Sequence, residues 1–181
     1  MDIQTRYQEA LKFASFKHAE KGQKVPGTNL PYDVHISNVA MEILIAAPNS
    51  PGFNTAFAVQ VAILHDTIED TATDFKELEN RFGIEIAKAV SALSKNDLLP
   101  KEQQMQDCLN RIKELPSEVW SVKLADRITN LQPPPSHWDD EKKRKYHKEA
   151  QTIHEALGSG NVYLASRLAT KIKEYESYFT S

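Results

Sequence analysis

The chain has 181 residues, of which 40% are hydrophobic, and a formal net charge of −3 at pH 7, so we expect one domain over residues 1–181 with a full buried core. The charges are spread along the sequence and form no basic patch, which argues against nucleic-acid binding, although a small anionic substrate needs only a few local cations. The single cysteine, Cys108, excludes an internal disulfide framework and cysteine-rich metal sites, and it indicates a reducing, cytoplasmic location.

The N-terminal half of the sequence predicts three helices. The first, over about residues 2–21, is amphipathic and charged throughout, so it predicts neither a signal peptide nor a membrane span. No other segment is apolar enough to cross a membrane. The loop GQKVPGTNLPY follows, and Asp33 is expected to cap the next helix. A third helix begins near Asn54 and runs through VAILHDTIED.

The remaining segments also read as helices. FKELENRFG is a short helix that Thr73 or Asp74 can cap and that ends on Gly83. Further helical patterns cover about residues 84–93, 101–114, 139–157 and 161–178, and Ser117 is expected to cap VWSVKLADRITNL. Because no alternating strand pattern of useful length occurs, the predicted fold class is all-α, a bundle of roughly eight to ten helices.

VAILHDTIED is an apolar helical run that turns abruptly into ionisable groups. His65, Asp66, Glu69 and Asp70 would fall on one side of a continuous α-helix, at its end. Unpaired buried charges are costly, so something must compensate this cluster. An imidazole beside a carboxylate suits a divalent cation, which makes a metal site the leading interpretation.

Two other apolar helices carry polar residues. Asp126 and Asn130 lie one turn apart in VKLADRITNL, and His35 begins a helix that is largely apolar afterwards. Three separate helices would thus each deliver a polar residue from a buried face. Brought together, His35, His65, Asp66 and Asp126 would form a site with two nitrogen and two oxygen ligands.

The segments PYDVHISNVA, ILHDTIEDT and VKLADRITNL, in this order, resemble the hydrolase domain of the RelA/SpoT family. That domain belongs to the HD phosphohydrolase superfamily, an all-helical fold named after its His-Asp doublet. The likeness covers nearly the whole chain, which is most similar to the stand-alone small alarmone hydrolases. The resemblance implies that His35, His65, Asp66 and Asp126 bind a single Mn²⁺ ion.

The resemblance also implies a reaction. Glu69 and Asp70 match the catalytic acidic pair of the family, which would orient a water molecule and accept its proton. Asn130 matches the asparagine that follows the KLAD motif and is expected to contact the substrate. The implied substrate is guanosine 3′,5′-bis(diphosphate) (ppGpp) or its 5′-triphosphate analogue, and the products are GDP or GTP plus pyrophosphate.

Some positions depart from the family pattern. The first loop normally carries a basic pair that meets the nucleotide, whereas here Lys24 is its only cation, and Gln132 and Pro133 follow KLADRITNL. These departures weaken the prediction of guanine specificity more than that of phosphohydrolysis. Tyr32, which could support the loop or stack on a base, and Lys95, which could meet phosphates, complete the expected substrate contacts.

Several alternatives stay open at this point. The enzyme could prefer the adenine analogues (ppApp) or remove the 2′-phosphate of NADPH. A catalytically silent alarmone-binding protein is the alternative from another class, although retention of both Glu69 and Asp70 argues against it. Asp126 could instead form a helix-surface ion pair with Lys123 or Arg127. The sequence leaves the oligomeric state open.

Overall fold

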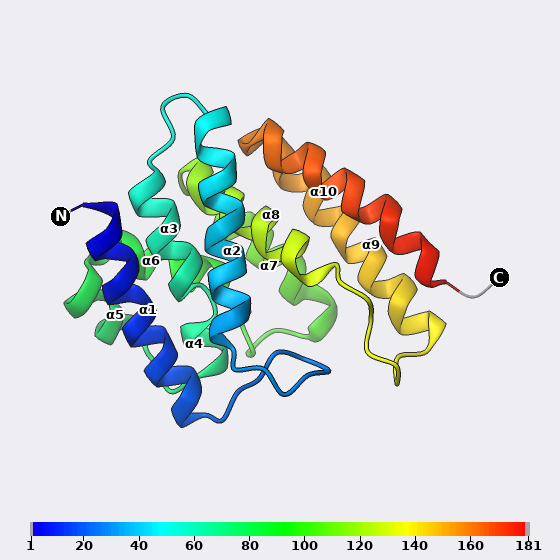
Figure 1. Cartoon of the computed structure of the whole chain (residues 1–181), viewed down its shortest axis with the longest axis horizontal. Helices are drawn as coiled ribbons and strands as arrows, with labels where there is room; N and C mark the ends of the chain where they lie inside the picture. Colours follow the sequence, from blue (N-terminus) through cyan, green and yellow to red (C-terminus); the bar gives the residue numbers. More distant parts are fainter. Residues whose placement is uncertain (1, 180–181) are drawn as a thin grey trace.

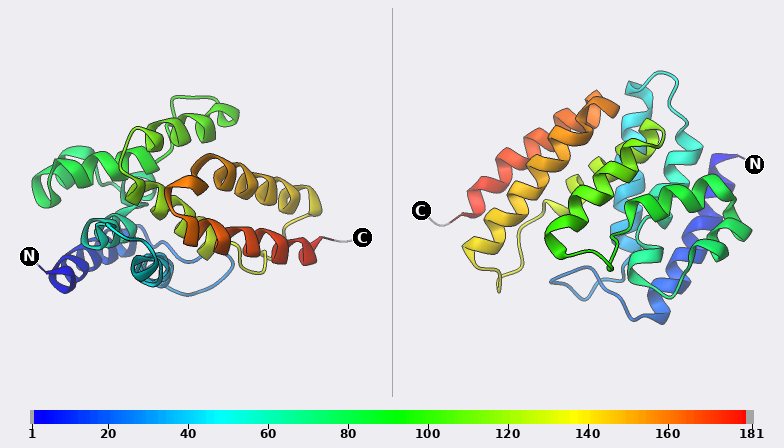
Figure 2. Two further views of the ribbon diagram at one scale, coloured as in Figure 1. Left: turned by 90° about the horizontal axis from the view of Figure 1, so that it is seen from above. Right: turned by 180° about the vertical axis from the view of Figure 1, so that it is seen from behind.

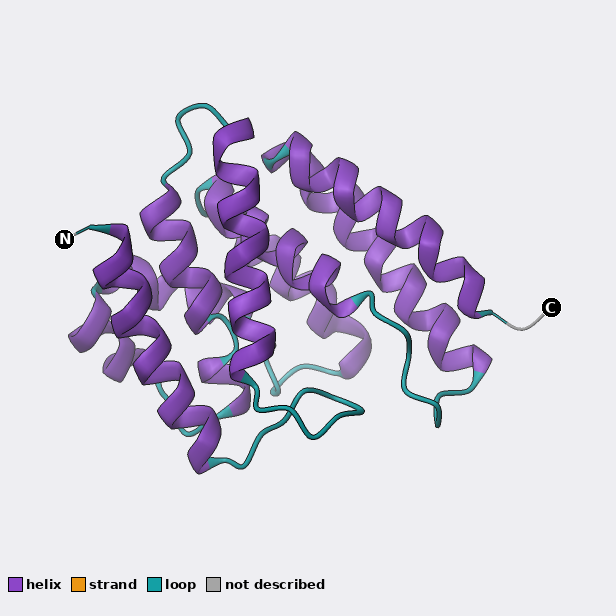
Figure 3. Ribbon diagram, viewed as in Figure 1, coloured by secondary structure: helices purple, strands orange, loops and turns teal. Residues whose placement is uncertain are grey.

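A computed structural model describes residues 2–179 of the chain (Figures 1 and 2). These residues form ten α-helices and three short 3₁₀-helices, and they contain no β-strand (Figure 3). A single isolated bridge, between Lys24 and Pro31, fastens the first long loop. The prediction of an all-α fold is therefore confirmed.

The α-helices are α1 (Ile3–Glu20), α2 (Asp33–Ala46), α3 (Thr55–Leu64), α4 (Thr67–Asp70), α5 (Phe75–Phe82), α6 (Ile84–Leu93), α7 (Lys101–Lys113), α8 (Ser117–Asn130), α9 (Asp140–Leu157) and α10 (Val162–Tyr175), and the 3₁₀-helices are η1 (Ala47–Asn49), η2 (Gly158–Gly160) and η3 (Glu176–Tyr178). Helices α9 and α10 form a hairpin at one end of the molecule, and α1 and α5 lie at the other (Figure 1). Helix α8 packs against α2 and α3 as well as against this hairpin, so it joins the two ends.

Helix α3 lies at the centre of the helices that form the rest of the molecule beside the α9–α10 hairpin. All its residues from Ala58 to Leu64 are buried, and α1, α2, α6 and α8 pack around it. A helix that is apolar on every side is expected in such a position. Because α3 and α8 are neighbours in the core, the His-Asp doublet that follows α3 is brought close to Asp126 on α8.

The helix containing the His-Asp doublet is not continuous, which corrects one prediction from the sequence. Helix α3 ends at Leu64, Asp66 (φ −99°, ψ 0°) precedes α4, and α4 starts at Thr67. Two side chains replace helical backbone bonds at the break: Thr67 Oγ1 donates to the Leu64 carbonyl (2.7 Å) and His65 Nδ1 to the Ala62 carbonyl (2.8 Å). The break separates the doublet from the acidic pair of α4.

Two predicted helix caps are also wrong. Asp33 and Ser117 lie inside the first turns of α2 and α8, and neither helix has a side-chain cap. In each case a preceding proline carbonyl already accepts a first-turn amide, from Val34 to Pro31 and from Val119 to Pro116. Asp74, by contrast, caps α5 as predicted, through the Glu77 amide.

No helix within residues 2–179 combines the length and the apolar character that a membrane crossing needs.

Candidate metal centre

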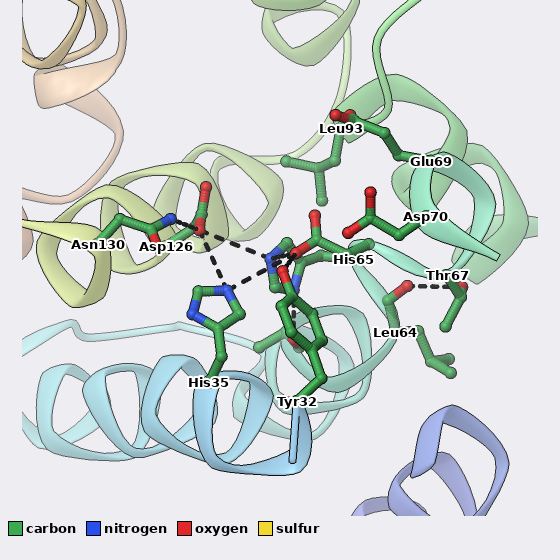
Figure 4. A network of polar contacts seen from close by, with 12 residues as sticks. Tyr32, His35, Leu64, His65, Thr67, Glu69, Asp70, Leu93, Asp126 and Asn130 are labelled. Carbon is green, nitrogen blue, oxygen red and sulfur yellow. Dashed lines mark hydrogen bonds and ion pairs between the residues drawn. The ribbon is translucent and has the colours of Figure 1, made fainter. Parts of the chain in front are cut away.

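Three buried side chains from three helices converge on one point. His35 lies in the first turn of α2, His65 follows the last residue of α3, and Asp126 lies in α8. One ligand atom from each lies within 4.8 Å of the other two, and we call this group the buried triad. Nε2 of His35 and Nε2 of His65 are 3.4 Å and 3.6 Å from Oδ1 of Asp126 (Figure 4).

The two imidazoles of the buried triad suit a metal ion. Nε2 of His35 and Nε2 of His65 are buried, and neither makes a hydrogen bond of good geometry among the described residues, although carboxylate oxygens lie 2.9–3.6 Å away. Nδ1 of His65 faces the Ala62 carbonyl, which can only accept, so Nδ1 carries a hydrogen and Nε2, which faces Asp126, is the nitrogen that a metal ion would bind once the ring is neutral. Two imidazole nitrogens and a carboxylate fit several divalent ions, Mn²⁺ among them.

Asp66 lies beside the buried triad. Its Oδ2 is 2.9 Å from Nε2 of His65 and 3.6 Å from Nε2 of His35, and it accepts a hydrogen bond from the Tyr32 hydroxyl at 2.5 Å. The Tyr32 ring is also close to the rings of His18 (4.6 Å) and His35 (5.0 Å). Tyr32 therefore contacts the side chains that surround the centre.

The charges of the centre are balanced internally. Burial opposes ionisation of Asp126, but Lys123, whose Nζ is 3.4 Å from Oδ2, together with the histidines outweighs it and holds the pKa of Asp126 well below its usual range. Burial likewise lowers the pKa of His65, yet Asp66 and Asp126 outweigh this and raise it well above the usual value. The ion pair with Lys123 thus exists, but inside the site and not on the helix surface.

The two residues of the acidic pair on α4 have different neighbours. Both carboxylate oxygens of Glu69 are engaged by Lys95, through Nζ at 2.6 Å and the backbone amide at 2.9 Å. Asp70 accepts a hydrogen bond from the Gln23 amide at 2.6 Å. Burial and the nearby Asp66 charge raise the pKa of Asp70, which makes its carboxylate a better proton acceptor than an exposed aspartate.

The residues that were expected to contact the substrate have different partners in the structure. Asn130 donates to Oδ1 of Asp126 at 2.5 Å, directly beside the buried triad. Lys24 reaches the Asn29 carbonyl of its own loop (3.3 Å). Lys95 lies at the side of Glu69, and its exposed ammonium group faces the acidic pair of α4.

A cavity of about 390 Å³ opens next to the buried triad. His35 and Asn130 line it together with the segment 132–135, and Trp138, Tyr146 and Tyr175 supply aromatic walls. None of the lining residues is Lys, Arg, Asp or Glu. Tyr175 is 1% exposed, and its hydroxyl has no hydrogen-bond partner among residues 2–179. The cavity therefore offers apolar aromatic surface, and one of its lining residues, Tyr175, carries a buried hydroxyl group.

Several residues near the centre were not predicted from the sequence to be functional. Lys123 lies in the motif segment VKLADRITNL and Gln23 in the first loop, GQKVPGTNLPY, so their positions beside expected site residues were the available signal. Tyr146 and Tyr175 lie on α9 and α10, far along the chain, and carry no local pattern that distinguishes them from other core aromatics.

Comparison with known proteins agrees with this geometry. The chain matches the HD domain family over residues 10–161. It is 30% identical to guanosine-3′,5′-bis(diphosphate) 3′-pyrophosphohydrolase MESH1 of Homo sapiens over 92% of each chain, and 29% identical to MESH1 of Xenopus tropicalis over 88% of this chain and 89% of that one.

Solved structures agree as well. A metazoan orthologue of SpoT that hydrolyses ppGpp superposes with a TM-score of 0.80 at 25% identity, over 93% of this chain and 94% of that chain. The protein lmo0812 from Listeria monocytogenes EGD-e shares the fold, with a TM-score of 0.64 at 22% identity over 82% of this chain and 99% of that chain. The chain belongs to the HD-domain family and is a relative of the stand-alone hydrolase MESH1.

Proposed function

We propose that this protein is a metal-dependent nucleotide pyrophosphohydrolase that removes the 3′-pyrophosphate of ppGpp or pppGpp and releases GDP or GTP plus pyrophosphate. The observation that carries the proposal is the buried triad of His35, His65 and Asp126 in a chain related to MESH1. A small nucleotide is the proposed partner, and the cytoplasm is the proposed location.

The ligand set is proposed to hold one Mn²⁺ ion, with Asp66 as the fourth ligand. When bound, such an ion supplies positive charge at the phosphoryl oxygens and favours ionisation of water. Asn130 donates to Oδ1 of Asp126 while Lys123 lies at Oδ2, so the carboxylate is restrained at both oxygens. This restraint fixes the ligand geometry in advance of binding.

Asp70 is proposed as the general base. Gln23 binds its Oδ2, which leaves Oδ1 to accept a proton from the attacking water. Glu69 is proposed to position the same reaction through Lys95, because it holds the lysine ammonium group at 2.6 Å. Lys95 then supplies positive charge for the phosphates, with Lys24 as a weaker, loop-borne contribution.

The cavity beside His35 is the proposed site of the nucleobase. Its volume of about 390 Å³ falls within the range of small-molecule sites, and its aromatic walls suit a planar ring. The Tyr175 hydroxyl, which has no partner in the structure, can form a hydrogen bond with the edge of the base.

One observation supports a second candidate, a preference for ppApp. Guanine presents two neighbouring N–H donor groups that a carboxylate binds well, and no Asp or Glu lines the cavity. The side-chain amides of Asn38 and Gln132, which do line it, can pair with either purine.

A three-substrate panel tests the proposal. Purified protein is incubated with Mn²⁺ and ppGpp, ppApp or NADPH, and products are separated by anion exchange and assayed for pyrophosphate and orthophosphate. We expect ppGpp to yield GDP and pyrophosphate, and EDTA to abolish the reaction. If only ppApp were consumed, the enzyme would be a pyrophosphohydrolase that prefers adenine. If NADPH released orthophosphate and ppGpp stayed intact, the enzyme would be a phosphatase of NADPH. Unchanged ppGpp, under conditions where MESH1 hydrolyses it, would contradict the proposal that this protein acts on guanine nucleotides.

A further inference from the structure

Two hydrogen bonds link the end of α1 to the acidic pair of α4. His18 Nδ1 is 2.7 Å from Oε1 of Gln23, and Nε2 of Gln23 donates to Oδ2 of Asp70 at 2.6 Å. The three residues come from α1, from the loop after it and from α4. No motif in the sequence predicts this connection.

The chemistry of the groups fixes the direction of both bonds. An ionised carboxylate can only accept, so the amide nitrogen of Gln23 must face Asp70. The amide oxygen then faces His18, whose Nδ1 must carry a hydrogen. If the amide were flipped, its oxygen would face the Asp70 carboxylate, and the bond to Asp70 would be lost.

The surroundings of His18 hold its ring in place. The side chain is 1% exposed, and its ring lies 4.6 Å from that of Tyr32. The backbone amide of Gln23 donates to the His18 carbonyl (3.0 Å), and Gly22 has the positive φ (66°) that turns the chain at this point. Burial lowers the pKa of His18, which favours a neutral ring with a single N–H.

We infer that Gln23 is a positioning residue for Asp70 and that His18 keeps the Gln23 amide in the required orientation. Gln23 occupies one carboxylate oxygen and thereby directs the other toward the reacting water. The bond also offsets the repulsion that the neighbouring charges of Asp66 and Glu69 exert on Asp70. The catalytic part of this inference rests on the proposed function.

Kinetics of two variants test the inference. Gln23→Met keeps the length of the side chain and removes both hydrogen bonds, while His18→Phe keeps a ring beside Tyr32 and removes the N–H. We expect Gln23→Met to lower kcat about 10- to 100-fold, as for loss of a hydrogen bond to a charged group, with KM and Mn²⁺ affinity within about twofold of the parent. Gln151→Met, at an exposed position of α9, is the matched control and should leave kcat unchanged.

A double-mutant cycle separates positioning from general structural damage. Because His18 acts through Gln23, His18→Phe should lower kcat less than Gln23→Met, and the double variant should be no slower than Gln23→Met alone. Additive losses, an unchanged kcat in Gln23→Met, or a rise in KM without a fall in kcat would each overturn the inference.

An NMR measurement tests the chain of hydrogen bonds from His18 through Gln23 to Asp70, which we call the relay, without using activity. Long-range ¹H–¹⁵N spectra of the wild-type protein should show His18 as the Nδ1–H tautomer, and this preference should weaken in Gln23→Met. An Nε2–H tautomer in the wild type would overturn the relay even if the variants were slow or failed to fold. If the wild type hydrolysed none of the three nucleotides, the proposed function would fail, while the His18 tautomer would still decide whether the relay exists.

Discussion

The buried triad and the mouth of the site, which we define as segments 21–32, 94–100 and 131–139, are built in different ways. The triad residues are held by α2, α3 and α8 inside the core. The mouth consists of loops, in which Lys24, Lys95 and Gln132 are exposed. The difference implies that metal chemistry depends on the packed core, whereas substrate preference depends on segments that can vary without disturbing it.

The largest expected effect comes from the buried triad. His65→Ala removes one of its two imidazole ligands, so Mn²⁺ binding by calorimetry should fall below detection and hydrolysis should drop by at least about 1,000-fold. His137→Ala, at an exposed histidine of the mouth, is the matched control. Parent-like Mn²⁺ affinity in His65→Ala would show that the ion binds elsewhere.

The next effect separates metal binding from chemistry. Asp70→Asn should lower kcat about 100- to 10,000-fold, because the general base is lost, while Mn²⁺ affinity stays close to that of the parent. Asp97→Asn, an exposed carboxylate in the mouth, should have no comparable effect. Turnover of Asp70→Asn at the parent rate would remove Asp70 from the proposed mechanism.

Mn²⁺ affinity should depend on pH. The pKa of His65 in the metal-free protein is raised well above its usual value, which favours a ring protonated at both nitrogens, and metal binding must displace the proton on Nε2. Affinity should therefore rise with pH, by about tenfold per unit while one proton is released. Calorimetry in two buffers of different ionisation enthalpy measures that proton, and equal affinities at pH 6 and pH 8 would contradict its displacement.

A smaller effect is expected in the cavity. Tyr175→Phe removes the buried hydroxyl that has no partner in the structure, so the fold should keep its melting temperature. If the hydroxyl binds the base, KM should rise about two- to tenfold with kcat retained. Tyr178→Phe, outside the cavity lining, is the control, and an unchanged KM in Tyr175→Phe would exclude this hydroxyl from base binding.

The smallest effect is expected at the mouth. Lys24 is exposed and contacts a carbonyl of its own loop, so Lys24→Ala should change KM by less than about threefold, as for a solvent-exposed charge. Steady-state kinetics at low and at physiological salt measure this change. A tenfold rise in KM would mean that the loop closes on the substrate and gives Lys24 a larger role.

The sequence predicted those features that depend on helical periodicity and missed those that depend on tertiary contact. The all-α fold and the polar positions His35, His65 and Asp126 follow from the pattern of apolar residues. The break after Leu64 did not, because it depends on side chains that compete for backbone carbonyls.

The surroundings of the centre were less predictable. Gln23 meets Asp70 across 47 positions of sequence, and the cavity walls combine α8 with α9, α10 and the 131–139 loop. Such pairings are set by helix packing, which leaves no local periodic signal in a single sequence. Resemblance to a known family can identify matched positions but cannot supply contacts made by positions that differ.

The most direct test of the metal centre is a crystal structure of the protein with Mn²⁺, using anomalous scattering at the manganese edge. We expect one anomalous peak about 2.0–2.3 Å from Nε2 of His35, Nε2 of His65 and a carboxylate oxygen of Asp126. A peak bound by other residues, or no peak at the buried triad at saturating Mn²⁺, would contradict the assignment of this site.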